Sequence, residues 1–388
     1  MKKLCHIFFD EYPKDSRIRR YTNALLEKRV EIFIVCINDG SYSFFEKEKN
    51  TNIYRLSLKK KRNSFIRRLW EYIIFQIFAT TMVSYIAIRH NVKIFQVHTL
   101  PDFLVFSCII PKLKGSNIIL DFHELFPELM MQFNPDLNSS SLTVKILYLL
   151  EKLSFNFATH IITLHDPAKE ILLKRINSMK PVITVMNGVD ISEIPDFKKR
   201  NSDEFKIIYN GTINYNLNLS LVVKALNVIK NRCPEIYNNI GFYLYGDGPD
   251  VNRIKRISLD LGIEKVRFKG RYKFKDMIKE LETASVCILP PKKDVYSDLY
   301  YSLKLTEMIY LKIPVIATRL ETYCRYYPEN CLIYFDSENV EELADKIIFV
   351  YKNRSDLSSF TENAYNEYQK INWEIMKERY INIIKSLQ

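Results

Sequence analysis

The sequence predicts an α/β protein built from two doubly wound domains, each with a parallel sheet covered by helices on both faces. Short apolar runs typical of buried strands alternate with helical patterns along almost the whole chain. This alternation breaks at 187–205, where Gly188 and a run of Asp, Asn and charged residues are typical of an interdomain linker. The length of 388 residues is enough for two such domains, each with its own core.

The order of the elements supports a parallel sheet in each half. In the first half we expect strands at 3–9, 31–37, 93–98, 117–123, 160–165 and 182–186, with helices at about 17–28, from about 101, and at 142–157. In the second half we expect strands at 205–211, 240–246, 266–270, 285–290 and 314–318, and helices near 219–232, 250–262, 274–284, 303–312 and 340–352. The segment 360–388 has the pattern of one long helix. Successive strands joined by helices are expected to be parallel.

The composition limits the class of protein. Hydrophobic residues make up 47% of the chain and charged residues 26%, which is typical of a globular protein. The formal net charge of +12 favours an anionic partner, either nucleic acid, an acidic membrane surface or a phosphorylated ligand. No compact nucleic-acid recognition motif is present, so we do not expect a nucleic-acid partner. Seven scattered cysteines without a Cys-x-x-Cys pair predict reduced thiols in a cytoplasmic protein.

The segment 59–90 combines a basic cluster with a long apolar helix. The cluster consists of Lys59, Lys60, Lys61, Arg62, Arg67 and Arg68. Aromatic residues among these basic ones at 59–72 are typical of a surface that docks on anionic lipid. A core helix with a solvated, charged entry explains the pattern equally well, and both explanations stay open. A helix that spans the membrane is less favoured, because Glu71 and Gln76 interrupt the apolar run.

Glycines lie where the strands of the second half are expected to end. They are Gly211, Gly246, Gly248 and Gly270. In parallel sheets, ligands bind beyond the carboxyl ends of the strands. Glycine at such an end permits a tight turn or a close approach of the backbone to a ligand. The sequence therefore predicts a binding site at this edge of the second sheet.

The segment 303–318 predicts the chemistry of that site. Its helical part places Lys304 and Glu307 three positions apart near the helix start, so both project from one side. Free N–H groups at a helix N-terminus suit a diphosphate, and the lysine adds a positive charge. A glutamate can accept hydrogen bonds from the two hydroxyls of a ribose. The pair is typical of a nucleotide-diphosphate pocket, although a surface ion pair would have the same spacing.

The ordered set of motifs resembles the retaining glycosyltransferases of family 4, which have the GT-B fold. The motifs in the second half are YNGTI, YGDGP, VRFKGR, SVCILPP and Lys-x-x-Glu with PVIAT. The first half adds VHTLPDFLVF, LDFHELFPEL and MNGVD, and WEIMKERYINII resembles the family's last helix. The resemblance covers nearly the whole chain. It implies two Rossmann-like domains facing a cleft, namely 1–190 for the acceptor and 205–360 for the nucleotide sugar, and a C-terminal helix, 361–388, that returns to the first domain.

The resemblance also assigns roles to individual residues. On the donor side, Lys304 would contact the diphosphate, Glu307 the ribose, and Arg271 would lie near the base, while Gly211, Thr212 and Gly246 would line the pocket. His123 and Asp102 would approach the transferred sugar as candidate catalytic residues, and Asp15, Arg17 and Glu124 would lie on the acceptor side. Two alternatives stay open: His123 is a buried, hydrogen-bonded histidine, and Asp102 is the N-cap of a helix that begins near Phe103.

The implied activity is transfer of a sugar from a nucleotide-diphosphate sugar to a glycan or undecaprenyl-linked acceptor with retention of configuration, in surface polysaccharide synthesis. We expect no essential metal and no other cofactor, because no Asp-x-Asp occurs. The expected location is cytoplasmic, with possible peripheral contact at the inner face of the plasma membrane.

The chain departs from the family pattern at Leu299, where a glutamate is common, at Ser302, where some branches have proline, and at Asn218, near an expected lysine. We expect Lys292 or Lys293 to replace that cation. These departures keep open a non-catalytic GT-B partner subunit. A nucleotide-sugar epimerase is a further alternative.

Overall fold

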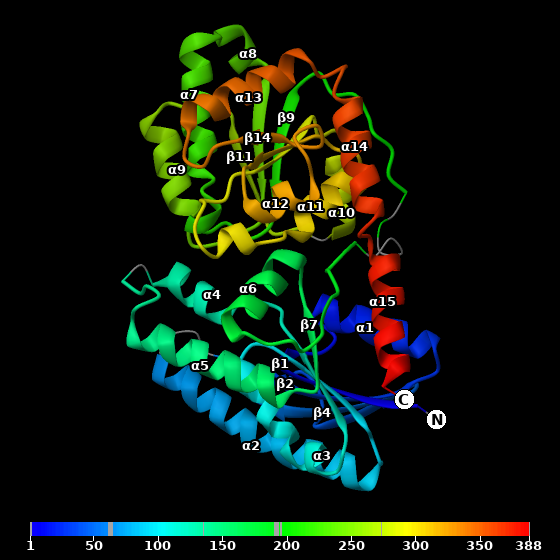
Figure 1. The fold of residues 1–388 in the computed structure, drawn as a ribbon. Helices are drawn as coiled ribbons and strands as arrows, with labels where there is room; N and C mark the ends of the chain where they lie inside the picture. Colours follow the sequence, from blue (N-terminus) through cyan, green and yellow to red (C-terminus); the bar gives the residue numbers. More distant parts are fainter. Residues whose placement is uncertain are drawn as a thin grey trace. The chain divides into compact units, whose positions relative to one another are not determined.

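The computed structural model describes residues 2–60, 65–134, 136–189, 194, 196–272 and 274–387. The described chain divides into two compact units (Figure 1). Unit 1 contains Met1–Asn187 and Trp373–Gln388, and unit 2 contains Gly188–Asn372. Of the basic cluster predicted before the long apolar helix, Lys61 and Arg62 lie outside the described residues.

Unit 1 is built on an eight-stranded sheet with the order β3-β4-β2-β1-β5-β6-β7-β8. Its strands are β1 (Lys3–Glu11), β2 (Glu31–Asn38), β3 (Phe45–Glu48), β4 (Thr51–Ser57), β5 (Ile94–His98), β6 (Asn117–Asp121), β7 (His160–Thr163) and β8 (Val182–Thr184). All neighbours are parallel except β3 and β4, which form an antiparallel pair at the edge. The sequence analysis missed this pair. The pattern of β3 (FEKE) is too polar to be recognised as a strand, and its side chains are largely exposed.

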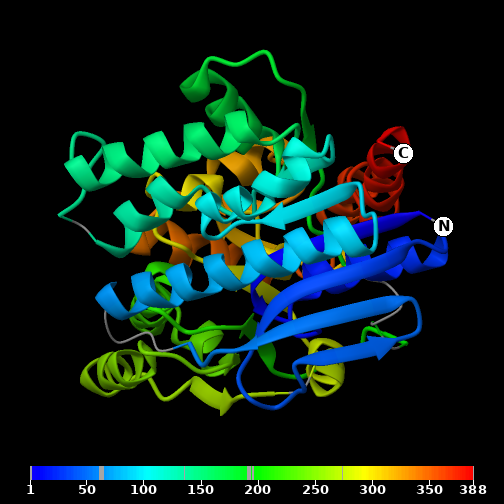
Figure 2. The same ribbon diagram turned by 90° about the horizontal axis from the view of Figure 1, so that it is seen from below.

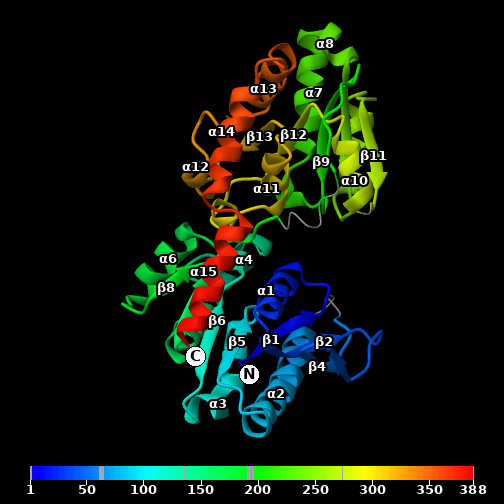
Figure 3. The same cartoon turned by 90° about the vertical axis from the view of Figure 1, so that its right-hand side faces the viewer.

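Helices cover both faces of this sheet. They are α1 (Ser16–Glu27), α2 (Phe65–Arg89), the 3-10 helix η1 (Asp102–Cys108), α3 (Ile109–Leu113), α4 (Phe126–Phe133), α5 (Leu142–Phe157), α6 (Asp166–Ile176) and α15 (Trp373–Ser386). Figure 2 shows α2 crossing one face of the sheet, where it contacts β1, β2 and β4. Figure 3 shows α1 and α15 together on the opposite face. The arrangement is that of a doubly wound domain.

The last helix of the chain belongs to unit 1 and is anchored in its core. Trp373, Met376 and Tyr380 are buried, and the Tyr380 ring stacks on Tyr21 of α1 at 4.1 Å between ring centres. The prediction of one helix over 361–388 was wrong: α14 (Ser358–Gln369) ends before α15 begins, and it belongs to unit 2. The sequence gives no warning of this break, because neither glycine nor proline occurs between 358 and 388.

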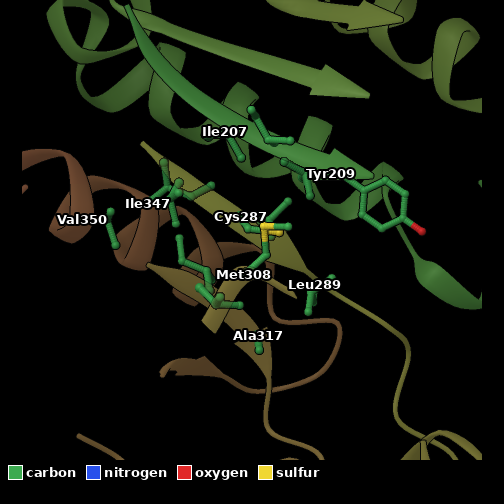
Figure 4. Close-up of a cluster of buried hydrophobic side chains, with 14 of the residues drawn as sticks. Ile207, Tyr209, Cys287, Leu289, Met308, Ala317, Ile347 and Val350 are labelled. Carbon is green, nitrogen blue, oxygen red and sulfur yellow. The ribbon is translucent and has the colours of Figure 1, made fainter. Parts of the chain in front are cut away.

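Unit 2 has a six-stranded parallel sheet with the order β11-β10-β9-β12-β13-β14. Its strands are β9 (Phe205–Asn210), β10 (Ile240–Tyr245), β11 (Val266–Gly270), β12 (Val286–Leu289), β13 (Val315–Thr318) and β14 (Ile333–Phe335). Its helices are η3 (Tyr215–Leu217), α7 (Ser220–Arg232), α8 (Pro234–Asn238), α9 (Val251–Asp260), α10 (Phe274–Leu281), η4 (Ser297–Leu299), α11 (Leu303–Tyr310), α12 (Glu321–Tyr326), α13 (Val340–Lys352) and α14. Figure 4 shows part of its core, where Met308 of α11 and Ile347 of α13 lie among residues of β9, β12 and β13.

Both units share one strand order. Six consecutive strands of each sheet, starting from β4 in unit 1 and from β11 in unit 2, follow the Rossmann order 3-2-1-4-5-6. The strand order therefore reverses between β1 and β5 in unit 1 and between β9 and β12 in unit 2. In this fold such a point opens a crevice at the carboxyl ends of the strands, where ligands bind. The topology thus predicts one candidate site in each unit.

Candidate functional site

In unit 2, a cavity of about 570 Å³ lies beyond the carboxyl ends of β9, β10 and β11. It is lined by Gly211, Thr212, Gly246, Asp247, Gly248, Arg271 and Tyr272. Most of the donor-side residues predicted from the sequence are therefore brought together at this edge.

The glycines allow the turns at this edge to approach one another. Gly246 has a φ of +141°, and a Cβ on it would lie 1.8 Å from the carbonyl oxygen of Gly211. A Cβ on Gly248 would lie 2.1 Å from the carbonyl oxygen of Ile213. The Gly211 N–H donates to the carbonyl of Tyr245 at 2.8 Å, which holds the two turns in place. The glycines at 246 and 248 are therefore required by contacts between backbones, independently of any ligand.

Lys304 extends toward the same edge from α11. Its Nζ lies 3.3 Å from the hydroxyl of Tyr209, near the end of β9. Its side chain passes so close to Gly211 that a Cβ there would lie 2.1 Å from Lys304 Cε. Lys304 is the second residue of α11, so its ammonium and the free N–H groups of the first helical turn offer positive charge at one place.

Glu307 lies about one turn further along α11, and its carboxylate acts electrostatically on Tyr272, which lines the cavity. Burial raises the pKa of Tyr272, and the nearby carboxylate of Glu307 raises it further. Burial also raises the pKa of Cys287 to about 12, an effect that Lys304 opposes and Glu307 reinforces. Both charged side chains of α11 therefore act electrostatically on Cys287 of β12.

Arg271 lies on the outer rim of the cavity. Its side chain is largely exposed, and its Nε lies 3.4 Å from Oδ2 of Asp247. An exposed pair of this kind contributes little to stability, and either partner can turn toward a ligand. The arginine is therefore available near the mouth of the cavity.

The residues that depart from the family pattern lie in turns and buried positions near α11 and η3. Leu299 is buried, and Asn218 occupies a left-handed turn with a φ of +49° after η3. The backbone N–H of Lys292 donates to the carbonyl of Asn216 at 2.9 Å, which places this lysine beside the turn where the expected cation is missing. Its Nζ meets Glu338 at 3.2 Å on the surface. Tyr301 packs inward, where its hydroxyl lies 2.8 Å from that of Tyr327.

Unit 1 has a larger cavity, of about 760 Å³, at the carboxyl ends of β1, β5 and β6. Its polar and charged lining consists of Asp10, Asp15, Lys60, Arg68, Glu71, Tyr72, His98, Thr99, His123, Glu124 and Asn134. His123, Asp15 and Glu124, which the sequence assigns to the sugar and acceptor side, therefore line one cavity. Asp15 also caps α1, because its Oδ1 accepts from the N–H of Ile18 at 3.0 Å.

A chain of histidines leads from the core of unit 1 to this cavity. His6 Nδ1 lies 3.0 Å from His98 Nε2, and His98 Nδ1 lies 3.0 Å from His123 Nε2. Asp121 stands beside the chain, with its Oδ2 3.3 Å from His98 Nδ1. Burial lowers the pKa of His6 and of His98, so both are neutral near pH 7.

The contacts favour one direction of hydrogen bonding along this chain. With a proton, His98 Nδ1 can donate to the Asp121 carboxylate and to His123 Nε2. Without a proton, its lone pair would face the carboxylate at 3.3 Å, which is repulsive. His98 Nε2 then accepts from His6 Nδ1, and the buried His6 Nε2, which has no hydrogen-bond partner, carries no proton. In this assignment neutral His123 is protonated on Nδ1, which suits a hydrogen-bond donor better than a base.

Asp121 is a buried charge with several polar partners. Its burial opposes ionisation, but the Arg17 guanidinium, with Nη2 3.0 Å from Asp121 Oδ1, and the adjacent histidines hold its pKa well below the usual range. Gln96 Nε2 donates to Oδ2 at 3.0 Å, and the Tyr380 hydroxyl donates to Gln96 Oε1 at 2.7 Å. Arg17 was predicted on the acceptor side, but it is buried in this ion pair and does not line the cavity.

Asp102 is also absent from the cavity lining. It is the first residue of η1, whose N-cap is Pro101, so the prediction that Asp102 itself caps this helix was wrong by one residue. Its side chain is buried, and Oδ1 has no hydrogen-bond partner. Burial, together with Glu151 and Glu128, raises its pKa well above the usual range. This position gives no support for a catalytic role.

Within the described residues, His98, Asp121 and His123 offer three donor atoms that lie within 4.8 Å of one another, a separation that a metal ion could bridge. The Arg17 guanidinium already neutralises the carboxylate, and the histidine rings are joined by hydrogen bonds. Hydrogen bonding therefore accounts for the cluster. The sequence analysis missed His6, His98 and Asp121. The available signal was a polar residue at the end of adjacent strands, since His98 and Asp121 are register partners in β5 and β6.

Comparison with known proteins agrees with this architecture. Residues 190–367 match the family model described as "Glycosyl transferases group 1". Sucrose-phosphate synthase from Thermosynechococcus elongatus has 15% identity and a TM-score of 0.75, with 100% of this chain and 99% of that chain covered. A glycosyltransferase from Rickettsia africae ESF-5 has 14% identity and a TM-score of 0.71, with 100% and 98% covered. No curated protein sequence gives a significant match.

These likenesses establish the fold as GT-B, with two Rossmann-like domains. The family match over most of unit 2 classes the protein as a glycosyltransferase.

The two buried aspartates of unit 1 should respond oppositely to removal of their charge. Asp121→Asn leaves Arg17 without its partner, so we expect a loss of about 3–5 kcal/mol in the free energy of unfolding at pH 7. Asp102→Asn removes an unfavourable buried charge, so stability at pH 8 should rise. Urea unfolding with hydrogen exchange in β5 and β6 measures both effects.

The pH dependence separates the two cases further. The pKa of Asp121 is lowered in the folded state, so its contribution is present above about pH 4 and is lost as the pH falls. The pKa of Asp102 is raised, so its penalty is absent below about pH 4 and grows as the pH rises. The advantage of Asp102→Asn should therefore vanish in acid. An equal loss for both variants at pH 8 would contradict this assignment.

Gly246→Ala should destabilise unit 2, because the new Cβ would collide with the Gly211 carbonyl. Gly270→Ala is a matched control at the end of the next strand: its φ is also positive, at +71°, but nothing lies within 4 Å. We expect about 1 kcal/mol for the control and a substantially larger loss for Gly246→Ala. Hydrogen exchange of β9 and β10 would reveal the difference, and similar protection in both variants would argue against the close approach.

Proposed function

We propose that this protein transfers a sugar from a nucleotide-diphosphate sugar to a glycan or lipid-linked acceptor, with retention of configuration, as family 4 glycosyltransferases do. The observation that carries the proposal is the position of Lys304 and Glu307 at the edge of unit 2. The Lys304 side chain extends along Gly211, which lines the cavity, and the Glu307 carboxylate acts electrostatically on Tyr272 of the same lining. A diphosphate and a ribose are the groups that this pair would hold.

The names of similar structures support a nucleotide donor. One is described as trehalose-6-phosphate from E. coli bound with UDP-2-fluoro glucose, and another as Anabaena HepE in complex with UDP. In this chain we assign the diphosphate to Lys304 and the first turn of α11, and the ribose to Glu307. The backbone at Gly211, Thr212 and Gly246 would line the nucleotide pocket. Lys292 would supply a second cation after it turns away from Glu338.

The leaving diphosphate gains negative charge as the sugar departs. Lys304 and the α11 N-terminus are fixed positive groups that would stabilise this charge. With no Asp-x-Asp motif in the sequence, we propose that this transfer needs no metal. His123, protonated on Nδ1, would donate a hydrogen bond to the transferred sugar, while Asp15 and Glu124 would bind acceptor hydroxyls in the cavity of unit 1.

The proposed setting is surface polysaccharide synthesis in the cytoplasm, with an acceptor that is a glycan or an undecaprenyl-linked intermediate. Lys60 and Arg68 in the cavity of unit 1 support an acceptor with anionic groups.

Calorimetric titration with UDP-, GDP- and other nucleotide sugars tests the donor site. We expect saturable binding of one donor, weakened about tenfold or more (about 1.4 kcal/mol) by Glu307→Ala and by Lys304→Ala. Glu235→Ala and Lys224→Ala, at exposed positions of unit 2, are the matched controls and should bind normally. Failure of every donor to bind would favour the non-catalytic partner subunit.

His123→Gln should separate turnover from donor binding. Because His123 would contact the sugar and not the nucleotide, the affinity for free nucleoside diphosphate should stay within about twofold, while its release from the nucleotide sugar falls about 100-fold. Release is measured with the acceptor present and, as a control, without it. Unchanged turnover would assign His123 to a structural role in the histidine chain.

A further inference from the structure

The outer side of unit 1 carries two exposed apolar stripes on neighbouring helices. On α2 the exposed large apolar residues are Leu69, Trp70, Ile73, Ile74, Ile77, Tyr85 and Ile88. On α5 they are Leu142, Ile146, Leu149 and Leu153. Their spacing of three and four positions places each set on one side of its helix. Both helices contact η1, and α3, which follows η1, adds Ile109 and Leu113. We call this set the α2–α5 surface.

The packing of the inner side of α2 against the sheet argues against α2 as a helix that spans a membrane. Residues Arg67–Arg89 are long and apolar enough to cross a membrane, but 33% of the most apolar window is buried inside the protein. Phe75, Ala79 and Val83 are fully buried on the side that contacts the sheet. A spanning helix would have to abandon this packing, whereas a helix lying in the interface keeps it and still buries its outer side.

The exposed charges on α2, η1, α3 and α5 themselves have one sign. Exposed basic residues on or directly after these helices are Arg67, Arg68, Arg89, Lys114, Lys145 and Lys152. The carboxylates of α2, η1, α3 and α5 are Glu71, Asp102 and Glu151, and all of them are buried. Arg67 Nε pairs with Glu71 at 3.3 Å, and Arg175 Nη1 binds Glu151 at 2.8 Å. The surface therefore presents apolar side chains and positive charge, with no exposed carboxylate on these described helices.

We propose that the α2–α5 surface docks on an anionic lipid bilayer, with α2 and α5 both lying in the interface. A protein partner would be expected to meet exposed charges of both signs on these helices, whereas anionic headgroups match the exposed charges of α2, α3 and α5, which are all basic. Trp70 and Tyr85 lie toward opposite ends of α2, each near exposed arginines, which is the distribution favoured at a membrane interface. This inference extends the basic segment at 59–72 to a second helix and does not depend on glycosyl transfer.

Binding to vesicles tests the proposal without donor or acceptor. The full chain should float with vesicles of phosphatidylcholine and phosphatidylglycerol, bind pure phosphatidylcholine at least about tenfold more weakly, and lose affinity as salt rises. Ile77→Glu on α2 and Leu149→Glu on α5 should each reduce binding about tenfold or more. Leu259→Glu, at an even more exposed apolar site on α9 of unit 2, is the control and should bind normally.

Charge reversal tests the basic rim. Lys145→Glu with Lys152→Glu should weaken binding about tenfold, whereas Lys224→Glu with Lys279→Glu changes the net charge equally in unit 2 and should have a smaller effect. Normal circular dichroism must accompany each variant. Absence of vesicle binding by the unaltered protein would overturn the proposal. Normal vesicle binding by Leu149→Glu would also overturn it. A dimer that forms without lipid and is dissociated by Ile77→Glu would overturn it too, because the surface would then bind a second copy of the chain.

Discussion

The ion pair between Arg17 and Asp121 is the interaction on which the cavity of unit 1 depends. It joins the start of α1 to the end of β6, and the same guanidinium donates to the carbonyl of Val185 at 2.9 Å. Through Gln96, Asp121 also reaches Tyr380 of the last helix. A buried ion pair tolerates little displacement, since separation of the two charges leaves an unpaired ion inside the protein. The return of the chain to unit 1 is thus specified by polar contacts as well as by apolar burial.

That network also determines the state of the cavity histidine. Asp121 orients His98, and His98 in turn faces His123, so a charge held by α1 acts on a ring that lines the cavity. In unit 2 the described lining of the cavity is held by contacts between backbones. There, neutral glycine turns approach within hydrogen-bond distance at the strand ends, and Lys304 extends over them from α11. Unit 1 therefore fixes its cavity by a pair of opposite charges. Unit 2 fixes its cavity by contacts between backbones, so that Lys304 can bind a ligand.

The sequence was most informative where a pattern has one physical cause. Alternating strands and helices follow from burying a parallel sheet on both faces, and this predicted both domains. Glycines at strand ends and the three-residue spacing of Lys304 and Glu307 are local features, so they located the cavity of unit 2. Arg17 and Asp102 could not be assigned in the same way. Whether a charged residue after a strand faces a cavity or the core depends on partners distant in sequence, and Asp121 lies 104 positions from Arg17.

The long helix α2 shows why its pattern allowed two interpretations. A helix that is apolar on all sides is expected either inside a core or in a membrane. The two sides of α2 have different surroundings. Phe75, Ala79 and Val83 are buried on the side that contacts the sheet. Ile73, Ile77 and Ile88 are exposed on the other side. The first turn carries a further role, because Arg68 lines the cavity that holds His123. If the outward side rests on lipid, the same helix places the mouth of this cavity close to the headgroups. An acceptor carried on a lipid could then reach His123 without leaving the bilayer, which gives the apolar outer side of α2 a reason to be kept.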